Sequence, residues 1–135
     1  QHYELPLHIF PGTDEEAWRK RAADGKERCK FCYETRMQKT AEFAADNGFD
    51  SFSTSLLVSP YQDREAIIRA GTAAAAEYGL EFEEHDWREQ YRRGQDLARE
   101  IGLYRQKYCG CIISLEDSKF YEKICAEHAQ LVQSS

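Results

Sequence analysis

The sequence lacks the long hydrophobic run that a membrane-spanning helix requires. No stretch of its 135 residues approaches about 18 consecutive apolar side chains. Residues 1–10 (QHYELPLHIF) have neither the cationic flank nor the apolar block of a secretory signal. These two absences argue against a membrane span and an exported protein, and we therefore expect a soluble protein of the cytoplasm.

Common catalytic and phosphate-binding motifs are also missing. The chain has no Walker motif, no G-x-G-x-x-G loop and no G-x-S-x-G nucleophile elbow, so nothing in it indicates nucleotide binding or serine hydrolysis. Residues 51–60 carry an unusual density of hydroxyl groups, which could line a polar cleft at the end of a strand. The hydroxyl residues are Ser51, Ser53, Thr54, Ser55 and Ser59.

The overall composition is that of a folded chain. A 41% share of hydrophobic residues and a 13% share of aromatic residues argue against disorder, although 31% of residues are charged and the net charge is -6. We expect one domain spanning residues 1–135, because this length leaves no room for a second core. Met37 is the only methionine and Gln1 is the first residue, so we expect further residues upstream.

Alternating strand and helix patterns predict an α/β domain with a mostly parallel sheet. Strands are expected at 3–10, 51–60 and 81–85. Helices are expected at 13–22 with Thr13 as N-cap, at 29–46, at 63–78 before Gly79, at 88–102 and, with a break near Asp117, at 112–132.

Two segments are basic in this acidic chain. Residues 26–39 and residues 88–108 each carry a net charge of +3. In the second segment, arginine and lysine alternate with aromatic residues, a mixture that could stack on unpaired bases and hold phosphates. The alternative is an ordinary solvated arginine face above packed aromatic rings. The residues concerned are Trp87, Arg88, Tyr91, Arg92, Arg93, Tyr104, Arg105, Lys107 and Tyr108.

The five cysteines carry the clearest chemical signal. Cys29 and Cys32 form a C-x-x-C at the start of an expected helix, where neighbouring cations favour thiolates that bind metal. Such pairs serve zinc, iron–sulfur and dithiol chemistry alike. Cys125 stands alone in the last expected helix, and we expect it to be a buried structural thiol.

Cys109 and Cys111 form a C-x-C that has two interpretations. The pair could complete a four-thiolate site with Cys29 and Cys32, although 76 residues separate the two motifs. It could instead form a reversible disulfide, because Gly110 permits a tight backbone and a strained ring is easily reduced. The spacing alone leaves both interpretations open.

Three blocks of sequence together resemble the QueH family of epoxyqueuosine reductases. The blocks are GKERCKFCYETRMQKTA, FDSFSTSLLVSPYQD and IGLYRQKYCGCIIS, and the resemblance spans about residues 14–116. It implies removal of the epoxide oxygen from epoxyqueuosine at the wobble position of tRNA, without cobalamin. It also implies a Rossmann-like fold related to adenine nucleotide alpha hydrolases, with flanking helices, here incomplete at the N-terminus.

The resemblance further implies roles for the cysteines. Cys29 and Cys32 match the C-x-x-C that, with an adjacent cysteine pair, holds a 4Fe-4S cluster in the family, and Cys109 and Cys111 match its redox-active disulfide. No adjacent cysteine pair is present in this chain, so we expect those ligands upstream of Gln1. Expected partners are a tRNA and an external electron donor such as ferredoxin or flavodoxin.

Two other functions fit the cysteines without the resemblance. One is a non-catalytic module in which a zinc ion is bound by Cys29, Cys32, Cys109 and Cys111. The other is a thiol–disulfide oxidoreductase that uses Cys109 and Cys111 alone.

Overall fold

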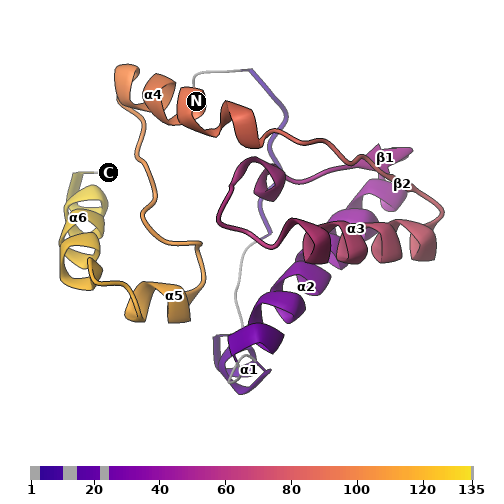
Figure 1. Cartoon of the computed structure of the whole chain (residues 1–135), viewed down its shortest axis with the longest axis horizontal. Coiled ribbons are helices and arrows are strands. Elements are labelled where there is room, and N and C mark those ends of the chain that lie inside the picture. The colour runs from indigo at the N-terminus through magenta and orange to yellow at the C-terminus, as the bar shows by residue number, and fades with distance from the viewer. Residues whose placement is uncertain (1–3, 11–14, 22–24, 135) are drawn as a thin grey trace.

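The computed structural model describes residues 4–10, 15–21 and 25–134. Its helices and short strands follow one another along the chain as Figure 1 shows. In order, they are α1 (Glu15–Arg21), α2 (Gly25–Asp46), β1 (Ser51–Phe52), η1 (Ser55–Val58), α3 (Arg64–Tyr78), β2 (Glu81–Phe82), η2 (Arg88–Gln90), α4 (Tyr91–Glu100), α5 (Ile112–Glu116) and α6 (Tyr121–Ser134).

Helices α2 and α3 form the packed centre of the molecule. Small and flexible side chains let the two helices approach closely, and Met37 fills the space between alanines. The main cluster of buried residues consists of Met37, Ala41, Ala44, Phe52, Ala74 and Ala75, and a second cluster consists of Tyr33, Leu57 and Ile67. The first turns of α2, which carry the C-x-x-C, are thus extensions of a helix fixed in the core.

Helix α3 begins and ends as the sequence predicts. The Asp63 side chain accepts a hydrogen bond from the Ala66 N–H at 3.1 Å and caps the N-terminus. Gly79 adopts a left-handed conformation, with φ of 68°, and closes the C-terminus. Helix α2 ends at Asp46 as predicted but begins at Gly25, one turn earlier than predicted.

The sheet consists of two short parallel strands, in which Ser51 pairs with Glu81 and Phe52 pairs with Phe82. The Phe82 ring lies directly on Gly71 of α3, where a Cβ atom would stand 2.3 Å from the ring, so only glycine fits there. The predicted strand 51–60 is wrong after Phe52, because Thr54 accepts the Leu56 N–H and starts a 3₁₀ turn. The predicted strand 81–85 is likewise limited to Glu81–Phe82.

Residues 4–10 were expected to belong to a strand, but they pair with no strand in the described part of the chain. Their apolar side chains remain exposed, and Ile9 keeps 76% of its surface accessible. His8 and Phe10 contact the Phe43 ring of α2, with centroid distances of 4.9 and 5.5 Å. The expected N-cap Thr13 lies outside the described residues.

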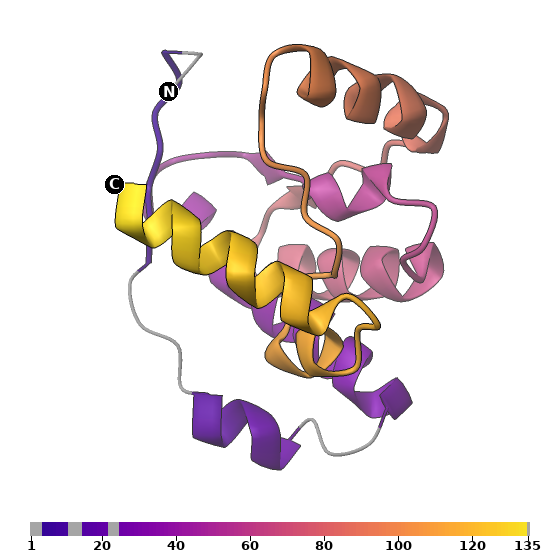
Figure 2. The ribbon, with the colours of Figure 1, turned by 90° about the vertical axis from the view of Figure 1, so that its left-hand side faces the viewer.

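The C-terminal helices match their predicted positions more closely. The basic segment forms η2 and α4, and Gly102 follows with φ of 72°. The last predicted helix is broken near Asp117 as expected, since α5 ends at Glu116 and α6 begins at Tyr121. Figure 2 shows the segment without helix or strand that descends from α4 to α5.

The chain is therefore an α/β protein that is mostly helical, and the large parallel sheet of the predicted Rossmann-like fold is not observed in the described residues. None of the helices in this part of the chain combines the length and apolar character needed to cross a bilayer.

Candidate redox site

The first part of the site lies on the N-terminal turns of α2. Cys29 and Cys32 are three residues apart on this helix, so their thiols lie on the same face, one turn from each other. The Cys29 side chain is exposed, whereas Cys32 is half-buried. Arg28 and Arg36 lie beside the two cysteines on the same helix.

The second part of the site is the segment that precedes α5. Gly110, with φ of 102°, adopts a backbone conformation that L side chains rarely adopt, and it turns the chain between the two cysteines. Cys111 then caps α5, and its sulfur accepts the Ser114 N–H at 3.2 Å. Cys109 is exposed and Cys111 is half-buried.

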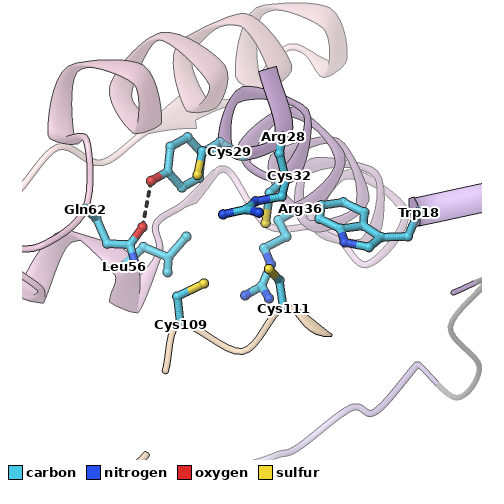
Figure 3. Close-up of a pocket in the computed structure, with 10 residues that line it drawn as sticks. Trp18, Arg28, Cys29, Cys32, Arg36, Leu56, Gln62, Cys109 and Cys111 are labelled. Carbon is cyan, nitrogen blue, oxygen red and sulfur yellow. Dashed lines mark hydrogen bonds between the residues drawn. The ribbon is translucent and has the colours of Figure 1, made fainter. Parts of the chain in front are cut away.

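The two parts meet at a small cavity of about 20 Å³. Figure 3 shows Cys109 and Cys111 on their loop opposite the C-x-x-C of α2. The cavity is lined by Trp18, Arg28, Cys29, Cys32, Tyr33, Arg36, Leu56, Gln62, Cys109 and Cys111. Four thiols that come from motifs far apart in the sequence therefore share one enclosure.

Arg36 lies one helical turn after Cys32 and faces both motifs. Burial raises the pKa of the Cys32 thiol, and the Arg36 guanidinium opposes that rise because it favours the thiolate. One Arg36 nitrogen lies 3.8 Å from the point where a Cβ atom on Gly110 would stand. Arg36 forms no ion pair with a carboxylate among the described residues, so its charge is available to groups in the cavity.

Tyr33 anchors the rear of the cavity. Its hydroxyl donates to Gln62 Oε1 at 2.6 Å and accepts the Asp63 N–H at 3.4 Å. Burial raises the pKa of the Tyr33 phenol above its ordinary value. These contacts tie the start of α3 to α2 directly behind the cysteines.

The two thiols of the C-x-C have different surroundings. The Cys109 thiol donates to Ser114 Oγ at 3.1 Å, and the Ser114 hydroxyl in turn donates to the Cys111 carbonyl at 2.8 Å. Burial alone would raise the pKa of the Cys111 thiol, but hydrogen bonding from Ser114, chiefly from its backbone N–H, holds that pKa below its ordinary value. The Cys111 sulfur is thus the better hydrogen-bond acceptor of the two.

A second, larger cavity of about 650 Å³ adjoins the small one. This volume falls within the range of about 300–1,000 Å³ that is common for small-molecule sites. Trp18, Cys32, Arg36 and Cys111 line both cavities and so form the boundary between them. The remaining lining residues are Glu15, Ala17, Phe31, Thr35, Lys39, Tyr108, Gly110, Ile112 and Leu115.

Polar contacts at the surface connect the loop of the C-x-C and helix α5 to the rest of the chain. Arg19 of α1 forms a two-fold contact with Glu116 of α5, at 2.6 and 3.1 Å. The Lys107 ammonium lies 3.3 Å from the Glu127 carboxylate of α6. Tyr104 Oη also lies 3.1 Å from a ring nitrogen of His128 on α6. The loop is therefore attached to α1 and to α6 mainly by exposed polar groups.

Metal binding can be judged from the donors present. Cys29 and Cys32 lie on one face of α2, beside two arginines, and both line the small cavity. Their thiols therefore fit as two ligands of a thiolate-bound group such as an iron–sulfur cluster. No cluster of three or more potential ligands of the Cys, His, Asp or Glu type occurs in the portion of the chain that is described. The four-cysteine zinc site accordingly finds no support in this geometry.

Other residues that the sequence singled out lie elsewhere. Cys125 was expected to be buried, but it is exposed on α6, so that prediction is wrong. The hydroxyls at Ser51, Ser53 and Thr54 bond to Glu83 or to the adjacent backbone, which gives them structural roles. Of the basic aromatic segment 88–108, Tyr108 lines the larger of the two cavities described above.

Sequence reasoning missed several residues of the site. Arg36 follows Cys32 by four positions, which places it on the same helix face, and this spacing could have identified it. Ser114 follows Cys111 by three positions, which is the spacing of an N-cap and its N3 residue. Trp18 carries no such signal, because it reaches the site only through the placement of α1.

Comparisons with known proteins agree with this constellation. The sequence model of one family, described as Epoxyqueuosine reductase QueH, matches residues 4–117. A protein of that name from Dehalococcoides mccartyi is 38% identical over 87 residues, covering 64% of this chain and 48% of its own length. The protein of the same name from Thermotoga maritima is 38% identical over 98 residues, which cover 71% of this chain and 51% of the relative's length.

A third relative covers more of this chain. The protein of the same name from Helicobacter pylori is 35% identical over 124 residues, covering 87% of this chain but 33% of its own length. The chain spans about half or less of the length of these relatives.

Proposed function

The chain belongs to the QueH family of epoxyqueuosine reductases, and on that premise we propose that it contributes the redox site of an enzyme that reduces epoxyqueuosine to queuosine in tRNA. This reaction adds two electrons and two protons to the epoxide, releases water and leaves an alkene. The observation that carries the proposal is the common cavity of the C-x-x-C and the C-x-C.

Cys29 and Cys32 would hold a 4Fe-4S cluster. They supply two thiolate donors, and two further ligands are expected outside this chain, as the resemblance implies. Such a cluster would supply single electrons. Burial raises the pKa of the Cys32 thiol, and the nearby Arg36 guanidinium opposes that rise, so it favours the thiolate state that binding requires.

Cys109 and Cys111 would store the two electrons as a dithiol and become a disulfide in each turnover. Their closeness in sequence and the turn at Gly110 favour intramolecular closure. An external donor such as ferredoxin or flavodoxin would restore the dithiol, since the sequence contains no recognisable nicotinamide-binding motif.

The larger cavity would receive the modified base. Its aromatic residues Trp18, Phe31 and Tyr108 are suited to contact a flat ring, and Lys39 is suited to bind an anionic or polar group. The thiols of Cys32 and Cys111 at its boundary would then lie next to the epoxide.

Arg36 would stabilise the epoxide oxygen. Cleavage of a C–O bond leaves negative charge on oxygen, and a guanidinium that already faces the cavity can hold that charge without rearranging. Because an arginine does not release its proton near neutral pH, a thiol or water must supply the proton.

The rest of the tRNA would contact surfaces around this cavity. Arg92 and Arg93 of α4 are exposed and could bind phosphates, in line with the expected basic face. We further propose that residues 1–135 belong to a single domain, that the complete enzyme has a Rossmann-like fold, and that it works in the cytoplasm.

Anaerobic reconstitution of the full-length protein, including the segment expected to supply the two further ligands, with iron and sulfide tests the proposed function. Metal analysis and visible absorption measure the cluster, and mass spectrometry of digested tRNA measures conversion of epoxyqueuosine. We expect iron, a chromophore lost in Cys29→Ser, and conversion lost in Cys109→Ser. Cys125→Ser serves as the control, because Cys125 lies outside both cavities.

Two results would contradict the proposal. One tightly bound zinc per chain, with neither iron nor conversion, would support the non-catalytic module instead. Reduction of protein disulfides that persists in Cys29→Ser, with no epoxyqueuosine conversion by the unaltered full-length protein, would support a thiol–disulfide oxidoreductase.

A further inference from the structure

Ser114 contacts both thiols of the C-x-C through different atoms. Its hydroxyl oxygen accepts the Cys109 thiol at 3.1 Å, whereas its backbone N–H donates to the Cys111 sulfur at 3.2 Å. No other residue in the described ranges hydrogen-bonds to both sulfurs.

Local geometry explains how one serine reaches both cysteines. Cys111 is the N-cap of α5, so its side chain naturally meets the N–H three residues later, which belongs to Ser114. The turn at Gly110 then brings Cys109 back over the first turn of α5. The Ser114 hydroxyl also donates to the Cys111 carbonyl at 2.8 Å, which fixes its orientation and leaves its lone pairs for Cys109.

We propose that Ser114 is a positioning residue that makes the two thiols unequal and stabilises the dithiol form of the pair. Cys109 is held as a hydrogen-bond donor to the Ser114 hydroxyl, and Cys111 is held as an acceptor of the Ser114 N–H. This inference rests on the proposed role of Cys109 and Cys111 as a redox pair.

The hydroxyl contact can exist only in the reduced state. When the pair oxidises, both sulfurs lose their protons, two electrons leave and an S–S bond forms, so Cys109 has no hydrogen to donate. The bond between Cys109 and Ser114 Oγ therefore favours the dithiol. The bond from the Ser114 N–H requires only an acceptor sulfur, and it is kept by any residue other than proline at position 114.

Equilibration of the chain with mixtures of reduced and oxidised glutathione tests the proposal. Each dithiol that closes converts one oxidised glutathione into two reduced molecules, so the reaction balances. Mass spectrometry of the peptide that contains Cys109 and Cys111 measures the oxidised fraction under anaerobic conditions at constant pH.

Ser114→Ala should shift this equilibrium toward the disulfide by about threefold to tenfold, the effect of one net hydrogen bond. A tenfold shift corresponds to about 30 mV for a two-electron couple. Ser114→Thr keeps the hydroxyl and should remain near the unaltered chain. Ser118→Ala is the matched control, because the Ser118 hydroxyl accepts the Phe120 N–H after α5 and does not contact either thiol.

Variants that keep one of the two cysteines of the C-x-C separate the two contacts. With Cys111 replaced by serine, Ser114→Ala should accelerate exchange of Cys109 with oxidised glutathione, because the thiol loses its acceptor. With Cys109 replaced by serine, the same change should not accelerate exchange of Cys111, because the backbone N–H remains and the Ser114 hydroxyl favours the Cys111 thiolate. A merely structural role for Ser114 would alter both rates together.

The possible failures are distinguishable. If the unaltered chain never forms a disulfide between Cys109 and Cys111, the redox-pair role fails and the role of Ser114 fails with it. If the disulfide forms but Ser114→Ala matches the unaltered chain, or shifts no more than Ser118→Ala, only the proposal for Ser114 is overturned.

Discussion

Cys29 and Cys32 lie on a 22-residue helix whose inner face is buried in the core, whereas Cys109 and Cys111 lie on a segment without helix or strand. On α2, Tyr33 is 4% exposed and Met37 is 2% exposed, directly after the C-x-x-C. Around the C-x-C, the contacts that hold the loop are hydrogen bonds and ion pairs between partly exposed groups.

This difference suits two kinds of redox chemistry. A metal cluster needs ligands that stay in place, and side chains buried between α2 and α3 can move only if the core opens. A dithiol that becomes a disulfide must bring two sulfurs together in each turnover, and a loop held by a few surface contacts can adjust at small cost. The fold thus separates a rigid pair from an adjustable pair at one cavity.

The largest expected effect comes from removing one thiol of the adjustable pair, Cys109 and Cys111. Cys111→Ser should lower epoxyqueuosine reduction by at least about a thousandfold, because the remaining thiol cannot form the intramolecular disulfide. The melting temperature should hardly change, since serine can still cap α5. Single-turnover conversion measured by mass spectrometry checks this result, and conversion within a few-fold of the unaltered chain would contradict it.

Breaking the rigid part should instead affect stability. Met37→Ala removes most of a buried side chain between α2 and α3 and should cost about 2–5 kcal/mol of the free energy of unfolding. Urea unfolding followed by circular dichroism measures this loss. Met37→Leu roughly conserves volume and should cost under about 1.5 kcal/mol. If both variants lower the free energy of unfolding by the same small amount, packing of Met37 against α3 does not hold α2 in place.

Arg36 lies on the rigid helix but faces the adjustable loop, so its replacement tests whether the two parts act together. Arg36→Met should lower kcat by about a hundredfold if Arg36 has the proposed role, because the epoxide oxygen would then lose its cation. Arg36→Lys should recover much of the rate. Steady-state kinetics with Lys39→Met as control should show a raised KM and nearly normal kcat for the control, since Lys39 lines only the larger cavity. A change in KM alone for Arg36→Met would assign Arg36 to binding.

The same division explains which features could be predicted from sequence. Helix α3 was predicted accurately because Asp63 and Gly79 are local signals, and the two cysteine motifs were identified by their spacing. The short strand at Ser51–Phe52 was predicted too long because a serine- and threonine-rich run reads as extended, although Thr54 turns it. Trp18 and the common cavity depend on distant packing, which no local pattern records.

The smallest expected effect concerns the surface contact between Arg19 and Glu116. The Arg19 guanidinium holds the pKa of the Glu116 carboxyl below its ordinary value. A lowered folded-state pKa stabilises the protein above the ordinary carboxyl range, and this contribution is lost as pH falls through the lowered value. Glu116→Gln should therefore lower the melting temperature by a few degrees at most near pH 7, and the difference should disappear in acid.

The same variant also tests whether the loop is adjustable. Release of α5 from α1 should accelerate closure of the Cys109–Cys111 disulfide by oxidised glutathione, because the loop opens more readily. Glu42→Gln, a change at an exposed position of α2, should alter neither the pH dependence nor the closure rate. If Glu116→Gln leaves closure unchanged while lowering stability at neutral pH, the contact stabilises the fold without restraining the thiols. The ability of the second pair to move would then have to come from residues 103–111 themselves, where Gly110 turns the chain, and from the contact of Cys109 with Ser114 of α5.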